Sequence, residues 1–310
     1  MYKYLVTGGA GFIGSRIAQQ LLDDEHKVYI IDNLKTGYVE NIPKEAVFIN
    51  GDFSKDETIS KLSDIKFDGI YHIGGQSSGE ISFEDPEYDL NTNTLSTLKL
   101  LQYSVKVGCK KFVYASTMSV YGEYDKKEQF IETDDTKPKS FYAVGKLASE
   151  KYMDIFSKQF DIDCISLRYF NVYGPGQNLE NMKQGMVSIY LKQFLDNSFD
   201  KVIVKGDLNR FRDLIYIDDV VDITIDAMYN KKYNNQIINV GTAKTTTVAT
   251  ILELIKRYTE SNKEVEIRSG TPGDQFGIYA NNHKLISLYS KNLTSFEIGL
   301  KKMIKWINEK

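Results

Sequence analysis

Cysteine, histidine, arginine and proline are all scarce in this 310-residue sequence, which has two, three, six and five of them. Two cysteines cannot build a disulfide framework, so we expect Cys109 and Cys164 to be buried free thiols, which is typical of the reducing cytoplasm. The three histidines stand far apart, at positions 26, 72 and 283. Because no His/Cys cluster is present, the sequence argues against a zinc enzyme and predicts no metal site.

Strong net charge and long apolar runs are also missing. The chain has 39 Lys+Arg against 42 Asp+Glu, for a formal net charge of −3. Nucleic acid and anionic membrane surfaces both require a basic stripe, so we expect neither as a partner. No window approaches the run of about 18 apolar residues that a transmembrane helix needs, and the segment before Gly8 is too short for a signal peptide. We therefore expect a cytoplasmic globular protein.

Short β-branched or aromatic segments alternate with helical periods in the first half of the chain. The expected strands are 3–7, 28–32, 47–50, 69–73, 112–116 and 164–168. The expected helices are 12–22, 58–62, 88–107 and 142–160. This alternation predicts βαβ units around a parallel sheet, which is a Rossmann-type doubly wound α/β fold.

The pattern changes after residue 170. We expect helices at 186–196, 217–228, 247–258 and 296–308, and strands at 202–205 and 237–240. The last strand can return to the main sheet. We therefore expect two domains: a first of residues 1–170 plus about 213–245, and a smaller, discontinuous C-terminal substrate domain of about 171–212 plus 246–310.

A glycine-rich segment, Gly8-Gly9-Ala10-Gly11-Phe12-Ile13-Gly14, lies between the first expected strand and helix. Glycines there let the backbone approach a pyrophosphate, which the amides of the helix N-terminus bind. Asp32 ends the second strand, where a carboxylate accepts both hydroxyls of an adenosine ribose and repels a 2′-phosphate. NAD is therefore favoured over NADP, although Lys35 stands nearby. Asp52 follows the third strand and either meets the adenine amino group or caps a helix.

Tyr142 and Lys146 are spaced by four residues, which places them on one face of the expected helix. A neighbouring ammonium group stabilises a phenolate, so we expect Lys146 to lower the pKa of Tyr142 toward the range of a general base. Thr117 follows the strand 112–116 at its carboxyl end, the edge where ligands bind in open α/β sheets. Its hydroxyl is suited to orient a substrate.

Four motifs together resemble the extended short-chain dehydrogenase/reductases, and within them the nucleotide-sugar epimerase/dehydratase group. They are the glycine turn, the segment 116–122 (Ser-Thr-Met-Ser-Val-Tyr-Gly), Tyr-x-x-x-Lys at 142–146, and the segment 167–176 (Leu-Arg-Tyr-Phe-Asn-Val-Tyr-Gly-Pro-Gly). The segments 72–76, 93–97, 212–219 and 239–241 agree as well. The resemblance implies bound NAD, a nucleotide-sugar substrate and a homodimer.

The resemblance assigns roles residue by residue. Tyr142 is the base, Lys146 tunes its pKa and holds the nicotinamide ribose, and Thr117 hydrogen-bonds the sugar. The implied cofactor-binding residues are Gly8, Gly11, Phe12, Ile13, Gly14, Asp32, Asn33, Thr36, Gly37, Asp52, Phe53, Ile73, Gly74, Gly75, Gln76, Asn93, Ser116, Tyr142, Lys146 and Tyr169. The implied substrate-binding residues are Ser78, Glu80, Thr117, Asn171, Arg210, Arg212 and Asp274.

Departures from the family pattern bear on the reaction. Dehydratases of the group carry an Asp-Glu pair after the active-site threonine, whereas Met118 and Ser119 stand here, which argues against a 4,6-dehydratase. Glu80 is either a solvated rim charge or a substrate ligand. The leading hypothesis is an NAD-dependent nucleotide-sugar 4-epimerase. The alternatives are a nucleotide-sugar 4-dehydrogenase, which begins with the same oxidation, and a non-catalytic NAD-binding regulator.

Two further expectations concern surfaces and arginines. Apolar faces on the helices 88–107 and 142–160 either form a dimer interface, as in the family, or cover the sheet; they carry Leu98, Leu101, Val105, Leu147, Met153 and Phe156. Arg168, Arg210 and Arg212 stand in or beside the motifs. We expect arginines of this group to meet the pyrophosphate of the substrate. Thr271 replaces the arginine of the family's Arg-Pro-Gly-Asp motif.

Overall fold

The computed structural model describes residues 1–63, 65–122, 129–270 and 276–309. The chain forms two compact units. Unit 1 comprises residues 1–122, 136–168 and 221–238, and unit 2 comprises residues 123–135, 169–220 and 239–310.

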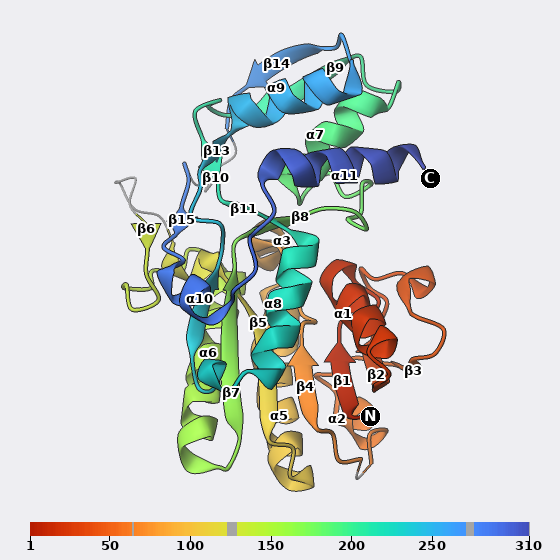
Figure 1. Ribbon diagram of the computed structural model, residues 1–310, viewed down its shortest axis with the longest axis vertical. Helices are drawn as coiled ribbons and strands as arrows, with labels where there is room; N and C mark the ends of the chain where they lie inside the picture. Colours follow the sequence, from red (N-terminus) through yellow and green to blue (C-terminus); the bar gives the residue numbers. More distant parts are fainter. Residues whose placement is uncertain (64, 123–128, 271–275, 310) are drawn as a thin grey trace. The chain divides into compact units, whose positions relative to one another are not determined.

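A seven-stranded parallel sheet organises unit 1 (Figure 1). Its strands, in spatial order, are β12 (Ile237–Val240), β7 (Asp163–Tyr169), β5 (Lys111–Thr117), β4 (Gly69–His72), β1 (Lys3–Thr7), β2 (Lys27–Asp32) and β3 (Val47–Asn50). Each strand expected in the first half of the chain is present within one residue, and the strand expected at 237–240 does join the sheet. The predicted doubly wound α/β fold is confirmed.

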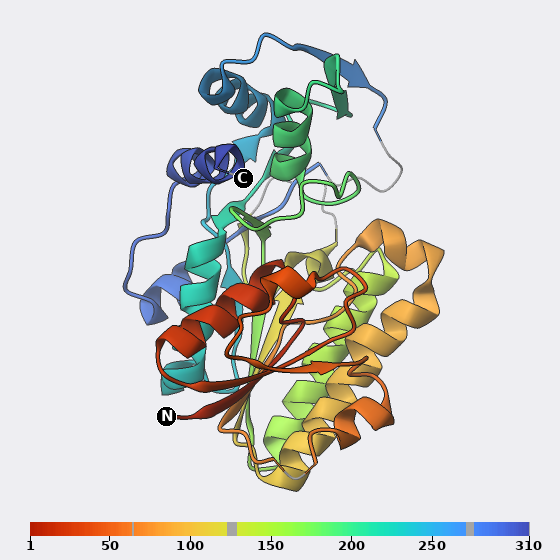
Figure 2. The same cartoon turned by 90° about the vertical axis from the view of Figure 1, so that its right-hand side faces the viewer.

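Helices cover both faces of this sheet (Figure 2). α1 (Phe12–Asp23) and α8 (Ile217–Tyr229) lie on one face, and α5 (Ser96–Val107) and α6 (Phe141–Gln159) lie on the other. Short helices α2 (Asp56–Ser60), α3 (Gly79–Glu84) and α4 (Pro86–Asp89) occupy the connections.

The apolar faces of α5 and α6 mostly pack onto the sheet. Leu101, Met153 and Phe156 are buried in one core cluster with Phe112 of β5, and Leu98 and Val105 pack against that cluster. Burial of these side chains is the main stabilising contribution, at about 25 cal/mol per Å² of apolar surface. These five residues therefore cover the sheet, which is one of the two interpretations offered for these faces, and Leu147 is partly buried.

A π-helical turn, Leu90–Leu95, directly precedes α5 where the sequence predicted one continuous helix from 88 to 107. The Thr92 hydroxyl donates to the Tyr88 carbonyl at 2.9 Å, and the Ser96 hydroxyl donates to the Thr92 carbonyl at 2.6 Å. Hydroxyls that bond to carbonyls one turn back compete with the regular ladder of a helix. π turns of this kind are frequent at functional sites.

The described residues of unit 2 form four two-stranded sheets and four helices. The strand pairs are β6 (Gln129–Phe130) with β15 (Tyr279–Ala280), β8 (Asn171–Tyr173) with β11 (Leu214–Tyr216), β9 (Lys201–Lys205) with β14 (Glu264–Arg268), and β10 (Phe211–Arg212) with β13 (Thr246–Thr247). The helices are α7 (Met186–Leu195), α9 (Val248–Thr259), α10 (His283–Leu288) and α11 (Phe296–Asn308). The helices expected at 186–196, 247–258 and 296–308 are confirmed.

The Asp213 carboxylate joins three segments of unit 2. It is fully buried. It accepts hydrogen bonds from the Thr242 amide at 2.8 Å, the Thr242 hydroxyl at 2.6 Å, the Ala243 amide at 3.1 Å and the Ala280 amide at 3.0 Å. Four donors compensate the desolvation of the charge, and they tie the strand 214–216 to the loops after residue 241 and to β15.

Candidate active site

The glycine turn between β1 and α1 is tightly packed. Gly8 has φ +69°, and a Cβ there would come within 2.5 Å of the Gly74 Cα atom. A Cβ on Gly14 would come within 2.2 Å of the Gly8 carbonyl oxygen. Side chains are therefore excluded at both positions, and the backbone amides of Phe12 and Ile13 open the N-terminal turn of α1. This arrangement is suited to bind a pyrophosphate.

Asp32 lies at the carboxyl end of β2 and is almost fully buried. Its Oδ2 accepts from the Ala10 amide at 3.0 Å, and its Oδ1 accepts from the Leu34 amide at 2.8 Å. Each oxygen keeps acceptor capacity for a further donor, because a carboxylate offers about four lone-pair sites. The side chain thus both fixes the glycine turn and can accept the hydroxyls of a ribose.

The loop after β2 places the next predicted cofactor residues. Asn33 Oδ1 accepts from the Lys35 amide at 3.0 Å, Thr36 is exposed, and Gly37 lies against Ala10. The Lys35 ammonium group stands over the ring of Tyr88, 3.2 Å from its centroid. This cation–π contact holds the Lys35 ammonium group at Tyr88. It therefore weakens the argument that Lys35 would bind the 2′-phosphate of NADP.

Asp52 and Phe53 lie beyond β3. The Asp52 side chain accepts from the Ser54 amide at 2.8 Å, whereas the N-cap of α2 is Lys55. Asp52 therefore forms a local turn and does not cap α2. Of its two proposed roles, contact with the adenine amino group remains. The Phe53 ring packs 5.5 Å from the ring of His72.

His72 connects the loop after β4 to α5. His72 Nδ1 lies 2.7 Å from Thr7 Oγ1, and the Gly74 amide donates to the same oxygen at 3.1 Å. On the other side of the ring, His72 Nε2 lies 3.1 Å from Thr97 Oγ1. Burial holds the pKa of His72 well below its ordinary value, so the ring is neutral. Thr97 donates its own proton to the Asn93 carbonyl, so Nε2 carries the ring proton and Nδ1 accepts from Thr7.

The predicted cofactor segment Ile73-Gly74-Gly75-Gln76 therefore rests on a hydrogen-bonded support. The Gln76 amide donates to Thr92 Oγ1 at 3.2 Å, and its side-chain nitrogen donates to the Ser78 carbonyl at 2.7 Å. Ser78 is buried and its hydroxyl caps α3. Glu80 is exposed in the first turn of α3.

Thr117, Tyr142 and Lys146 come together in unit 1. Thr117 ends β5, and Ser140 caps the N-terminus of α6, which carries the other two residues one turn apart. Lys146 is 4% exposed; its Nζ donates to the Ala115 carbonyl at 2.8 Å and lies 6.0 Å from the centroid of the Tyr142 ring. The predicted catalytic spacing is thus realised on one helix face beside a strand end.

The electrostatics of this pair differ from the expectation. Burial raises the pKa of Tyr142 to about 12, although a hydrogen bond with Thr117 opposes the shift. Burial also lowers the pKa of Lys146 to about 8, against the charge of Asp89. The expected lowering of the tyrosine pKa by the lysine is not met by the protein's own groups, because Lys146 is buried and Tyr142 is partly buried.

A buried ion pair supports the strand end behind Thr117. Arg168 Nε donates to Glu150 Oε1 at 2.9 Å and Arg168 Nη2 donates to Glu150 Oε2 at 2.7 Å. The Ser116 hydroxyl donates to the same carboxylate. Arg168 is 2% exposed. The expectation that Arg168 helps to bind a substrate pyrophosphate is therefore wrong, because its guanidinium forms a buried ion pair with the Glu150 carboxylate.

Unit 2 carries the other predicted ligands. Asn171 begins β8, and its Oδ1 is buried without a hydrogen-bond partner among the described residues. The pKa of Arg212 is lowered to about 10 by burial and by the neighbouring positive charge of Arg210. Two arginines that repel each other are stabilised by an anion between them.

Tyr169 ends β7 and is buried. Asp274 and Thr271 lie outside the described residues.

Sequence reasoning missed two buried acids, Asp89 and Glu150. Glu150 follows Lys146 by one helical turn, so its position on the catalytic face was available from the spacing. Asp89 ends α4, and no local pattern distinguished it from the exposed Glu87 beside it.

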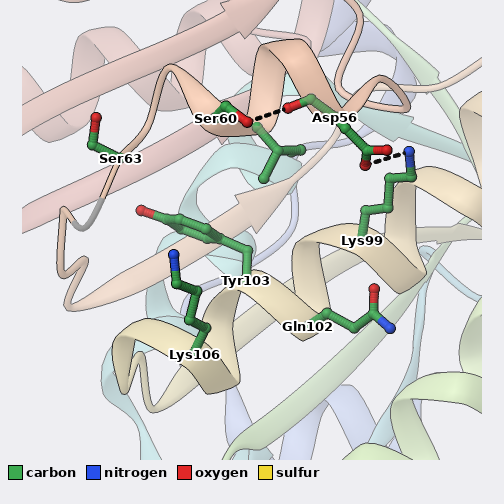
Figure 3. A pocket seen from close by; sticks show the side chains of 8 residues that line it. Asp56, Ser60, Ser63, Lys99, Gln102, Tyr103 and Lys106 are labelled. Atoms are coloured by element: carbon green, nitrogen blue, oxygen red, sulfur yellow. Dashed lines mark hydrogen bonds and ion pairs between the residues drawn. The ribbon is translucent and has the colours of Figure 1, made fainter.

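Other surface features do not coincide with these residues. A hollow with a volume of about 530 Å³ lies between α2 and α5 (Figure 3), where Lys99 Nζ is paired with Asp56 Oδ1 at 2.7 Å. Tyr103 and Lys106 also line it, but none of the predicted site residues does.

Within the described ranges, no helix combines the length and apolarity that a membrane span requires, and no group of three acidic, histidine or cysteine side chains is placed to hold a metal ion.

Comparison with known proteins gives consistent results. The sequence model of the NAD dependent epimerase/dehydratase family matches residues 4–241. A UDP-glucose 4-epimerase of Mycolicibacterium smegmatis is 32% identical over 280 residues, covering 88% of this chain and 87% of that protein. The structure of the Thermotoga maritima UDP-glucose 4-epimerase with UDP-glucose superposes with a TM-score of 0.94 at 33% identity, covering 99% of each chain. The Thermus thermophilus UDP-glucose 4-epimerase complex with NAD gives a TM-score of 0.89 at 32% identity, again covering 99% of each chain.

Proposed function

Because the chain belongs to the NAD dependent epimerase/dehydratase family, we propose that it is an NAD-dependent nucleotide-sugar 4-epimerase of the UDP-glucose or UDP-N-acetylglucosamine type. The observation that carries the proposal is the meeting of Thr117, Tyr142 and Lys146 at the carboxyl end of β5, in the unit that holds the glycine turn and Asp32. A non-catalytic NAD-binding protein on this fold has no need of that triad.

The residues of unit 1 fit NAD. The contacts of Gly8 and Gly14 leave backbone amides free of side chains at the N-terminus of α1, and Asp32 retains acceptor capacity. Gly11, Phe12, Ile13 and the loop 73–76 would hold the dinucleotide with Asn33, Thr36, Gly37, Asp52, Phe53, Asn93, Ser116 and Tyr169. When bound, NAD supplies the hydride acceptor and a positive ring that lowers the pKa of a neighbouring phenol.

Tyr142 removes the proton from the sugar C4 hydroxyl, which Thr117 orients by a hydrogen bond. Lys146 stabilises the phenolate by its charge. Oxidation at C4 would need the hydride acceptor that bound NAD supplies and would give a 4-keto sugar. Once this sugar has turned its other face to the cofactor, its reduction, with the proton returned by Tyr142, would invert C4. Burial of the phenol makes this transfer sensitive to charge, because the local dielectric is low.

Most of unit 2 falls within the proposed nucleotide-sugar domain. Arg212 and Arg210 would bind the pyrophosphate, and Asn171 would use its unpartnered oxygen for a donor of the substrate. Ser78, Glu80 and Asp274 complete the proposed substrate set. The division into a cofactor domain (1–170 plus about 213–245) and a sugar domain (about 171–212 plus 246–310) stays part of the proposal.

A turnover experiment separates the epimerase from its closest alternative. The purified protein is incubated with UDP-glucose and with UDP-N-acetylglucosamine, and products are followed by NMR and by the near-ultraviolet absorbance of NADH. We expect a stable mixture of two C4 epimers without net NADH. An accumulating 4-keto sugar with NADH would instead establish the 4-dehydrogenase. Unsaturated or deoxygenated products would establish a dehydratase, against which the side chains of Met118 and Ser119 argue because neither is an acid.

We also propose a homodimer and a cytoplasmic location. An exposed apolar stripe follows α3, the π-helical turn and α6; its members are Phe83, Leu90, Phe141, Val144, Tyr152 and Ile155. Exposed apolar patches of this kind mark association surfaces. The two buried free cysteines support a reducing compartment.

Replacing Ile155 with lysine is expected to convert the dimer to monomer, because the interface that covers the stripe would then bury an unpaired charge. Sedimentation velocity gives the association state. Ile267→Lys on β14 is the control, since Ile267 is 57% exposed, close to the 55% of Ile155, but lies in unit 2. A monomeric parent protein, or equal loss of dimer in both variants, would contradict the proposal.

A further inference from the structure

Asp89 is a buried carboxylate that the mechanism above does not use. It is 1% exposed, ends α4 and directly precedes the π-helical turn. A charge so far from water must be compensated by specific partners, because an isolated buried carboxylate is strongly destabilising.

The first partner is the side chain of Asn93. Its Nδ2 donates to Asp89 Oδ2 at 3.1 Å and to the Gln76 carbonyl at 3.0 Å. Two acceptors on one side fix the orientation of the amide, since the flipped form would set its oxygen against a carboxylate. Asn93 Oδ1 is consequently turned to Gly75, where a Cβ would come within 2.4 Å of it, and it is buried without a hydrogen-bond partner among the described residues.

The second contact is with the catalytic helix. Gly145 stands between Tyr142 and Lys146, and a Cβ at this position would lie 3.1 Å from Asp89 Oδ1. The missing side chain therefore lets the carboxylate approach the backbone of α6 between the two catalytic residues. The groups coupled to the Asp89 charge are the Asn93 amide of the π-helical turn and, on α6, the Lys146 ammonium and the Tyr142 phenol, whose pKa the Asp89 charge raises.

The charges of this cluster depend on one another. Burial raises the pKa of Asp89 to about 6, and the Asn93 hydrogen bond and Lys146 oppose the rise. Burial lowers the pKa of Lys146 to about 8, and Asp89 opposes the fall. Between these values both groups are charged, so each compensates the burial of the other.

We propose that Asp89 is a positioning residue of the active site that acts through Lys146: its carboxylate keeps the buried ammonium group charged beside Tyr142, and its bond to Asn93 turns the amide oxygen toward the Gly75 loop. The inference rests on the proposed function only in naming Tyr142 and Lys146 as the catalytic pair. The charge coupling itself belongs to the folded chain.

The coupling is tested by NMR titration of the full-length protein labelled with ¹³C at the lysine ε-carbon. Lys146→Arg identifies the Lys146 resonance by its loss, which separates it from Lys111, whose pKa burial also lowers. In Asp89→Asn, which keeps the size of the side chain and an acceptor for Asn93, we expect the Lys146 midpoint to fall by about one pH unit or more. Asp85→Asn is the matched control, because Asp85 is exposed and caps the same helix.

An unchanged Lys146 midpoint in Asp89→Asn, or an equal shift in Asp85→Asn, would overturn the proposal. If Asp89→Asn does not fold, Asp89→Ser removes the charge with a smaller side chain, and the same shift is expected. The titration needs no substrate, so it gives its answer even when the epimerase assignment fails.

The pH profile of turnover is the second readout. Activity that requires charged Lys146 falls as pH rises through the lysine pKa. We therefore expect the alkaline limb of the kcat profile to move to lower pH in Asp89→Asn and to stay in place in Asp85→Asn. A loss of kcat by the same factor at every pH would indicate a merely structural role and would also overturn the proposal.

Discussion

Tyr142→Phe is expected to lower kcat by about 10²–10⁴-fold while the protein still binds NAD. The variant removes only the phenolic oxygen, which is the atom that takes the C4 proton. The ring keeps its place in the first turn of α6, and Lys146 keeps its bond to the Ala115 carbonyl at 2.8 Å. The measurement is the initial rate of epimer formation, with cofactor content determined on the same preparation.

Tyr152→Phe is the matched control for this prediction. Tyr152 lies on the same helix, in the proposed association stripe, and is not among the residues proposed to contact the cofactor or the substrate. Its rate is expected to stay at the wild-type value. If Tyr142→Phe kept full activity, Tyr142 could not be the base, and the proton would have to pass to another group of the site.

Glu150→Ala is expected to reduce the free energy of unfolding by about 3–5 kcal/mol, because it leaves the Arg168 guanidinium buried without its counter-charge. The ion pair makes two hydrogen bonds, of 2.9 and 2.7 Å, and the guanidinium also stands 4.8 Å from the centroid of the Tyr121 ring. Burial lowers the pKa of Arg168, but the bonds to Glu150 outweigh this and raise it, so the arginine stays charged. Urea unfolding followed by circular dichroism measures the loss.

Two further variants test whether burial is the cause. Glu253→Ala breaks an exposed pair with Arg257, of 2.7 Å, and is expected to cost less than about 1 kcal/mol. Replacing Glu150 and Arg168 together with leucine and methionine removes both charges, and the double variant is expected to be much more stable than Glu150→Ala. Equal losses for Glu150→Ala and Glu253→Ala would contradict the prediction.

The elements with strong local signals were predictable from the sequence. Strands such as Lys3–Thr7 are short apolar runs beside turn residues, and the spacing of Tyr142 and Lys146 is fixed by helix geometry. The strand Glu264–Arg268 was missed although its residues alternate, because an exposed strand with three charged side chains gives little apolar contrast.

What the sequence could not predict depends on tertiary burial. The direction of the Tyr142 pKa shift follows from desolvation, which a spacing rule does not contain. The approach of Asp89 to α6 requires both the π-helical turn and the missing side chain of Gly145, which are distant in sequence. Arg168 was placed with the phosphate-binding arginines because its motif is close to theirs, whereas its partner, Glu150, comes from another element.

The bonds of Asp213 have a consequence for how the chain folds during synthesis. All segments of unit 1 have been made once residue 238 has left the ribosome, whereas Asp213 finds its last donor only at Ala280. Domains generally fold as units from the N-terminal side. Unit 1 can therefore complete its sheet while Asp213 of unit 2 still lacks its fourth donor. A ribosome stalled after residue 238 has emerged, but before residue 280 has, would present a finished first unit and an incomplete second one.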